Sequence, residues 1–107
     1  KLEDNSIELE NFRIVKIKTE GDRVEDCYML VANDKKGYVK LAAILKLNSN
    51  KFYFEYKQLG DSRAYRVVIC VGSCESGCDP VVRIQNGDKR EICSSCLDCQ
   101  KIDSEMQ

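Results

Sequence analysis

Residues 51–71 read KFYFEYKQLGDSRAYRVVICV and carry the clearest strand signal in the chain. Large apolar residues occupy every second position, first at Phe52, Phe54 and Tyr56, and then at Tyr65, Val67, Ile69 and Val71. A repeat of two is the geometry of a β-strand, because successive side chains point to opposite faces. The Gly-Asp-Ser segment at 60–62 favours a turn. The stretch therefore predicts strands at 51–59 and 64–71, each with one face in the core.

Apolar segments of strand length continue toward the N-terminus, separated by clusters of turn-forming residues. They predict three further strands, at 12–18, 24–32 and 38–47. The segment 38–47 contains Leu-Ala-Ala-Ile-Leu, which also suits a short helix, but tight turns on both sides and β-prone neighbours favour a strand. Its predicted core face consists of Val39, Leu41, Ala43, Leu45 and Leu47. Residues 1–11 are acidic and poor in apolar side chains, and we expect a loose lead-in there.

The chain changes character after Val71, where a polar segment with clustered cysteines begins. Asn86-Gly87 separates two short apolar segments, and this dipeptide adopts the positive φ angles of a tight hairpin turn. A hairpin is therefore predicted over 81–92, followed by a polar tail at 100–107 that we expect to fray. The predicted fold is mainly β. An antiparallel meander of about five strands over 12–71 forms a small sandwich or open barrel, and a cross-linked, cysteine-rich module at 72–107 belongs to the same structural unit.

Seven cysteines are unevenly distributed, with Cys27 alone in the first 69 residues. The other six lie close together, at Cys70, Cys74, Cys78, Cys93, Cys96 and Cys99. A chain of 107 residues buries a modest core, and clustered cysteines in small exported domains are typically disulfide-bonded. We therefore predict three disulfides among the six, in one of 15 pairings that the sequence leaves open. Cys27 is then the odd thiol, either buried and free or linked to another molecule.

Zinc is the main alternative for the cysteine cluster. Cys74, Cys78, Cys93 and Cys96 would hold one structural ion at the base of the hairpin, as in a zinc ribbon, although their spacing departs from the usual knuckles. An iron–sulfur cluster would need a fourth thiolate after the C-x2-C-x2-C run at 93–99. A thiol–disulfide oxidoreductase would use a C-x-x-C motif of that run, but such sites lie in a βαβ context that the sequence lacks.

Residues 70–74, Cys-Val-Gly-Ser-Cys, resemble the C-x-G-x-C ring segment of the cystine-knot growth factors. The resemblance implies that the glycine leaves room for a third disulfide to thread a ring made by two others. That family closes its ring with a C-x-C near the end of the chain, where this sequence has C-x2-C-x2-C. The resemblance covers five residues, and we do not assign the chain to the family.

Composition and charge argue against several function classes. Seventeen Lys plus Arg against eighteen Asp plus Glu give a net charge of −1, which provides no basic excess for binding nucleic acid. The chain has no histidine, so it lacks a histidine triad and an imidazole acid–base group, and we expect no enzyme. No apolar run approaches the roughly 18 residues that span a bilayer. The first residue is Lys1, which fits an exported chain whose signal segment has been removed.

These observations predict a non-catalytic binding domain that is stabilised by disulfides and located outside the cell, in the periplasm or on the cell surface. We expect no cofactor, and a protein or a glycan as partner. Tyr53 is the suggested contact residue, because it points away from the predicted core face and an exposed tyrosine offers a large contact area. The first alternative is an intracellular zinc-ribbon-like adaptor with a structural zinc held by four cysteines. The second is a thiol–disulfide oxidoreductase.

Overall fold

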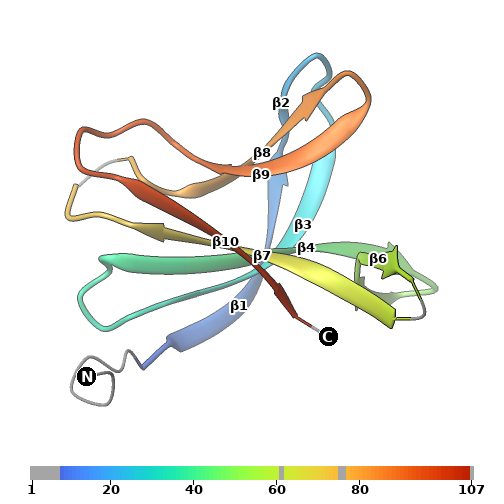
Figure 1. Ribbon diagram of the computed structural model, residues 1–107, viewed down its shortest axis with the longest axis horizontal. Helices are drawn as coiled ribbons and strands as arrows, with labels where there is room; N and C mark the ends of the chain where they lie inside the picture. Colours follow the sequence, from blue (N-terminus) through green and yellow to red (C-terminus); the bar gives the residue numbers. More distant parts are fainter. Residues whose placement is uncertain (1–7, 61, 75–76, 107) are drawn as a thin grey trace.

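The computed structural model describes residues 8–60, 62–74 and 77–106, and these residues form strands, turns and loops without a helix. The strands follow one another as β1 (Glu10–Lys18), β2 (Glu20–Gly21), β3 (Asp26–Asn33), β4 (Val39–Asn48), β5 (Lys51–Phe54), β6 (Tyr56–Leu59), β7 (Ser62–Val71), β8 (Pro80–Gln85), β9 (Asp88–Cys93) and β10 (Gln100–Met106) (Figure 1). The predicted mainly β class is confirmed. The described part of the chain contains no helix that could cross a bilayer.

Seven strands form one antiparallel sheet in the order β1-β3-β4-β7-β10, with β5 beside β4 and β6 beside β7. β4 pairs with β7 over its first half and with β5 over its second half. β8 and β9 form the hairpin of a smaller sheet, whose third strand, β2, runs parallel to β8. Figure 1 shows this smaller sheet on one side of the large one, so the fold has two layers.

Two tight turns confirm predictions made from short sequence patterns. β4 is a strand, as preferred over a helix for residues 38–47, and it ends at a turn where Ser49 and Asn50 have φ angles of 54° and 65°. Positive φ at both central residues is what a type I′ hairpin turn requires. Asn86 and Gly87 have φ angles of 54° and 85°, and they join β8 to β9 as predicted for the hairpin at 81–92.

The predicted strand at 51–59 is divided at Glu55. β5 pairs with β4, whereas β6 pairs with β7, so the chain changes its neighbour between the two segments. The backbone N–H of Glu55 donates to Ile44 O at 3.4 Å at this crossover. The next predicted strand, at 64–71, is confirmed and begins slightly earlier, at Ser62.

The hydrophobic core lies between the two sheets. Its buried residues are Cys27, Met29 and Val31 of β3, Ala42 and Ile44 of β4, Val68 and Cys70 of β7, Cys78, and Val82 of β8. The predicted core face of segment 38–47 is confirmed at Ala43 and Leu45, which are buried, but not at Leu47, which is exposed. The cluster between the two sheets instead takes Ala42 and Ile44, which point to the opposite side of β4. Both sets of residues are apolar, so a repeat of two does not reveal which face a second sheet covers.

Two terminal predictions need correction. Residues 100–106 do not fray but form β10, which pairs with β7 from Gln100 opposite Val71 to Met106 opposite Tyr65; residue 107 lies outside the described residues. A polar strand is stable here because the edge of β7 supplies backbone hydrogen-bonding groups. The predicted lead-in at 1–11 overlaps β1, which begins at Glu10 and contains an irregularity before Arg13. Residues 1–7 lie outside the described ranges.

Candidate functional site: the cystine cluster, the open sheet face and the Glu91 cavity

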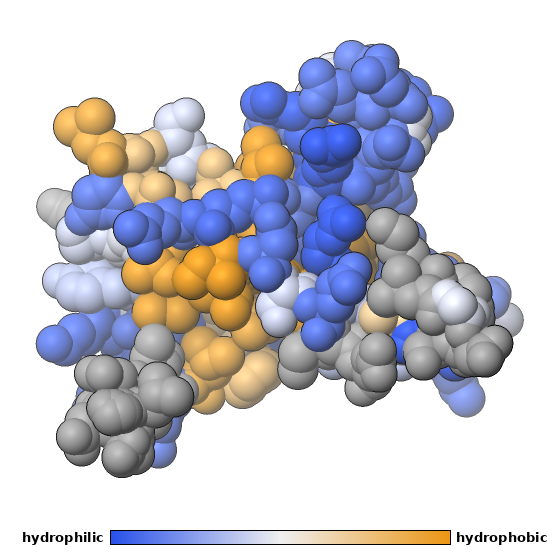
Figure 2. Space-filling view, in the orientation of Figure 1, coloured by the Kyte–Doolittle hydropathy of each residue, from blue (hydrophilic) through white to orange (hydrophobic). Residues whose placement is uncertain are grey.

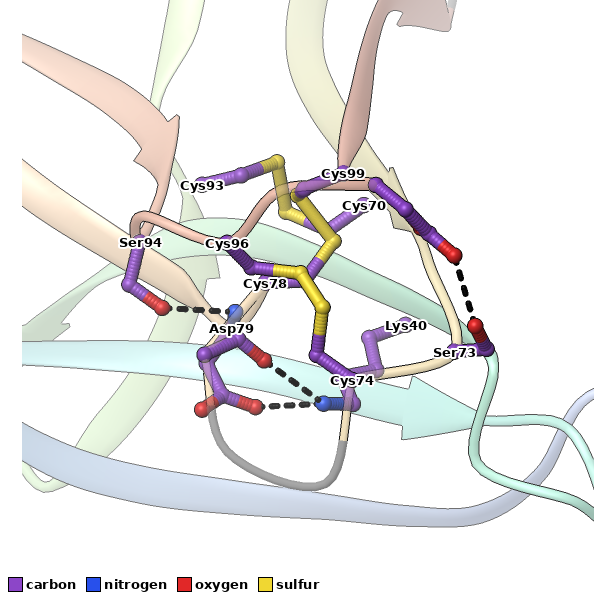
Figure 3. The surroundings of a disulfide bond; sticks show 12 residues. Lys40, Cys70, Ser73, Cys74, Cys78, Asp79, Cys93, Ser94, Cys96 and Cys99 are labelled. Carbon is purple, nitrogen blue, oxygen red and sulfur yellow. Dashed lines mark hydrogen bonds and ion pairs between the residues drawn. A yellow bond between two sulfur atoms is a disulfide. The ribbon is translucent and has the colours of Figure 1, made fainter.

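Three disulfides join the end of β7 and the loop after it to β9 and the segment before β10 (Figure 3). They link Cys70 to Cys93, Cys74 to Cys96 and Cys78 to Cys99, with Cα–Cα distances of 5.8, 6.5 and 5.4 Å. These distances lie in the usual range for a disulfide. The three predicted bridges are present, and the structure supplies the pairing that the sequence left open. Neither C-x-x-C motif is bridged to itself, and all four cysteines of the zinc alternative lie in these bridges.

Gly72 provides space for one of these bridges. A Cβ atom at this position would lie 2.9 Å from Cys78 Sγ and 2.8 Å from the backbone oxygen of Asp98. The Cys78–Cys99 bridge therefore packs against the 70–74 segment. The resemblance to a cystine-knot ring implies a disulfide at this place, beside the glycine. Ser73 Oγ donates to Asp98 Oδ2 at 2.6 Å and ties the same two segments together (Figure 3). A larger residue at position 72 would have to displace both.

The loop before β8 is fixed by polar contacts as well as by disulfides. Lys40 Nζ, on β4, lies 2.6 Å from Asp79 Oδ1 (Figure 3). The backbone N–H of Asp79 donates to Ser94 Oγ at 2.9 Å, and Ser94 N donates to Asp79 O at 2.8 Å. These bonds hold the loop against both β4 and the end of β9. The cystine cluster is thus a structural joint between the two sheets.

The sulfur atoms of the cluster are not arranged as free ligands or nucleophiles. Cys74 Sγ, Cys96 Sγ and a carboxylate oxygen of Asp98 lie within 4.8 Å of one another. Both sulfurs belong to one disulfide, however, so neither offers the thiolate that zinc binds.

Cys27 is the one cysteine outside the bridges, and it is a buried free thiol. Only 3% of its surface is exposed, and its place is in the core between the sheets. Burial raises the pKa of the Cys27 thiol, which keeps it protonated. A protonated thiol without access to solvent is a poor nucleophile. Of the two roles considered for the odd thiol, the structure shows the buried one.

The large sheet has one covered face and one open face. Residues paired across neighbouring strands share a face, so the register places the core residues toward β8 and the alternate residues on the other side. No strand of the described ranges packs on that other side, which we call the open face. It is formed by Ile14, Lys16, Tyr28, Leu30, Leu41, Ala43, Leu45, Leu47, Phe52, Phe54, Tyr56, Tyr65, Val67, Ile69, Val71 and Ile102. Ala43, Leu45 and Val67 of this set are buried.

Several large side chains of the open face are in contact with solvent. The exposed fractions of Ile14, Leu47, Phe52, Tyr56 and Ile102 lie between 39% and 47%. Figure 2 shows hydrophobic residues gathered in the centre and lower part of one view of the molecule, and hydrophilic residues at the upper right, where Figure 1 places the tip of the β8–β9 hairpin.

Aromatic rings fix one end of the open face. Tyr28 and Phe52 meet edge to face with ring centroids 5.1 Å apart. Phe54 stacks on Tyr65 at 4.0 Å, and Tyr56 meets the same tyrosine edge-on at 5.7 Å. Ring contacts of this kind restrict the side chains before any partner arrives, which lowers the entropy cost of binding.

Tyr53 lies on the other side of β5 from Phe52 and Phe54, and 45% of its surface is exposed. Tyr53 therefore points away from the side of Phe52 and Phe54, as the sequence analysis predicted. Phe52, Phe54 and Tyr56 belong to the open face, so the prediction that they point into the core is wrong. The same alternation that marks a core face also marks a face without a covering layer, which is why sequence reasoning missed this surface.

Glu91 is a second feature that the sequence analysis missed. It lies on β9 opposite Val82, points between the sheets and is only 3% exposed. Its Oε2 atom has no hydrogen-bond partner among the described residues. Glu91 lines a cavity of about 480 Å³ together with Arg66, Lys89 and others. Burial raises the pKa of Glu91 to about 8, against the opposing effect of the Arg66 guanidinium. The hairpin register could have revealed this position, because pairing across Asn86-Gly87 puts Glu91 on the face of Val82.

The chain's function has to be inferred from these features alone, because no family model, curated protein or solved structure matches it. The cystine cluster is structural, so two candidates for binding remain among the described residues. The open face extends over most strands of the large sheet, whereas the Glu91 cavity is confined to the gap between β9 and the large sheet. The open face therefore carries more of the argument.

Proposed function

We propose that this chain is a non-catalytic, exported binding domain that binds a protein chain through the open face of its large sheet. The uncovered apolar face is the observation that carries the proposal. Monomeric soluble proteins rarely expose a contiguous apolar patch larger than a few hundred Å², and larger patches mark contact sites.

The disulfides support the export part of the proposal. Disulfides persist in oxidising compartments and are rare in the cytosol. The three bridges occupy the six clustered cysteines completely, as expected of a structural framework. They also serve the binding role, because Cys70–Cys93 clamps β7 to β9 from the covered side. The large sheet can then keep its shape while its other face stays available.

A protein surface suits the open face better than a glycan. Along β4 the accessible residues of this face include the half-buried Leu41 and the exposed Leu47, neither of which offers a hydrogen bond from its side chain. A sugar would lose hydrogen bonds to water there without replacing them, and such a loss is costly. Phe, Tyr and Leu side chains instead suit the apolar centre of a protein interface.

Site-specific photo-crosslinking in the cells that naturally make the protein tests this proposal. A benzophenone amino acid replaces either Phe52, on the open face, or Tyr53, the adjacent and similarly exposed residue on the other side of the same strand. We expect a defined protein adduct from position 52 and none from position 53. No adduct at position 52, equal adducts at both positions, or an adduct at position 53 alone would overturn the proposal.

A further inference from the structure

The two faces of the large sheet hold different kinds of apolar residues. On the covered face the core contains Ala42, three cysteines and three valines, and its largest members are Met29 and Ile44. The open face carries leucines, phenylalanines and tyrosines along the same strands. Leu45 and Val67 of this face are buried, but several of the larger apolar side chains, such as Phe52 and Tyr56, are exposed in the single chain. A face of this composition is suited to permanent cover, because its exposure opposes folding in water.

The exposed area of the open face approaches what a stable dimer needs. A large apolar or aromatic side chain has roughly 150–250 Å² of surface. With 39–47% of that exposed, the five most accessible residues alone present about 400 Å². Half-buried members such as Leu30, Phe54 and Ile69 add to this value. A standard protein interface buries about 800 Å² on each partner, so this face is large enough to form one.

Charge on the open face favours a partner of the same kind. Between positions 41 and 47, β4 places no charged side chain on this face, because Lys46 lies on the other face with Tyr53. The charged groups near the open face are peripheral: Lys16 lies on the edge strand β1 opposite Tyr28, Lys18 is paired with Asp26 at 2.7 Å, and the Arg63 guanidinium lies 4.6 Å from the centre of the Tyr56 ring. A strongly charged partner would find no counter-charge in the centre. Two copies with a net charge of −1 each would meet with little overall repulsion.

We infer that the open face is covered by the open face of a second copy of this chain, in a two-fold symmetric dimer whose two large sheets pack face to face. This inference rests on the proposed function and names the partner. Two sheets with the same twist can pack with their strands within about 30° of each other, as in β-sandwiches. A two-fold axis makes such a contact closed and self-complementary, which limits assembly to a dimer. The smaller sheets then lie on the two outer sides.

Sedimentation equilibrium of the purified, oxidised chain tests the dimer. We expect twice the chain mass of 12.2 kDa. Phe52→Lys and Ile102→Lys each place a charge in the contact, and we expect dissociation to become roughly 30-fold easier or more. Tyr53→Lys, on the other side of β5, is the matched control and should leave the dimer intact. Circular dichroism with the characteristic strand spectrum shows that each variant is folded. A monomeric native chain, or a dimer that both open-face variants leave unchanged, would overturn the inference.

Photo-crosslinking of the purified chain keeps the test valid if a lysine variant fails to fold. The benzophenone label at position 52 should join two differently tagged copies, and the label at position 53 should not. If the purified chain gives no such product while position 52 captures a different protein in cells, the dimer is wrong and the proposed function stands. If position 52 gives no product in either setting, both are wrong.

Discussion

Glu91 is a buried carboxyl group whose pKa lies well above its ordinary value. Its carboxyl lies between the sheets, and burial is the largest influence on it, followed by the charges of Arg66, Asp103, Lys101 and Glu55. Together they raise the pKa of Glu91 from 4.5 to about 8. Between these pH values the folded chain keeps a proton that the unfolded chain has released. The folded state therefore becomes less favoured as the pH rises through this range.

The residue-scale prediction is that Glu91→Gln removes this pH dependence. The contribution of Glu91 to the free energy of unfolding should be highest below pH 4.5. It should fall by up to about 5 kcal/mol by pH 8. An amide of the same shape is neutral at both pH values, so the variant should be more stable than the native chain at pH 8. Urea unfolding at about pH 5 and pH 8, followed by tyrosine fluorescence, measures the difference.

A matched control for this prediction is Glu105→Gln, which removes an exposed carboxylate that lines the same cavity. It should leave the fall in stability between the acidic and the alkaline measurement unchanged. If native chain and Glu91→Gln variant lose equal stability over this range, the burial of Glu91 does not control the pH dependence.

At the scale of the strands, sequence reasoning succeeded where the pattern is local. The hairpin at 81–92 depends on Asn86 and Gly87, and β4 is a strand because the turns beside it are close in sequence. β10 was missed because its stability comes from the edge of β7, about thirty residues earlier, rather than from its own polar side chains. The covered face was missed for a related reason. The middle of β4 is buried on both sides, and which side the smaller sheet covers depends on where β8 and β9 dock, which the Cys70–Cys93 bridge helps to fix.

At the same scale, the cystine cluster predicts which cysteines react with an alkylating reagent. Alkylation followed by intact-mass measurement should add no label to the native chain, because Cys27 is buried and the other six cysteines are bridged. Denaturation without reductant should add one label, at Cys27, and reduction should allow all seven cysteines to react. Digestion of a separate, unreduced sample followed by tandem mass spectrometry should show Cys70 linked to Cys93, Cys74 to Cys96 and Cys78 to Cys99.

A metal assay of the same sample is the companion measurement. Six labels added without reductant, together with about one zinc per chain, would contradict the disulfide framework and favour the alternative of a zinc ion held by four cysteines. Loss of a native disulfide from a small domain typically costs about 2–5 kcal/mol. Each single bridge deletion, such as Cys70→Ala with Cys93→Ala, should therefore lower the urea midpoint substantially. The Cys70–Cys93 deletion also tests the clamp between β7 and β9 directly.

At the scale of the whole molecule, the large sheet has apolar residues on both faces, but the smaller sheet covers only one of them. Val82 of β8 packs on the covered face, whereas no strand of the described ranges lies opposite the exposed Phe52. Sequence patterns identified both sets of residues as apolar and alternating. They could not separate a core within one chain from an interface between chains, because both kinds of surface are apolar.

A dimer formed through the open face makes thermal stability depend on chain concentration, because unfolding then separates two chains. A tenfold increase in concentration adds about 1.4 kcal/mol to the free energy of unfolding of the dimer. For a unit of this size, that raises the melting temperature by about 3–5 °C. Scanning calorimetry of the native chain over a hundredfold range of concentration should show this rise, and so should the Tyr53→Lys variant. Phe52→Lys should show no rise at concentrations where it is already a monomer before it unfolds, since a monomer unfolds independently of its concentration. A constant melting temperature for the native chain would show that its open face is not covered by a second copy during unfolding.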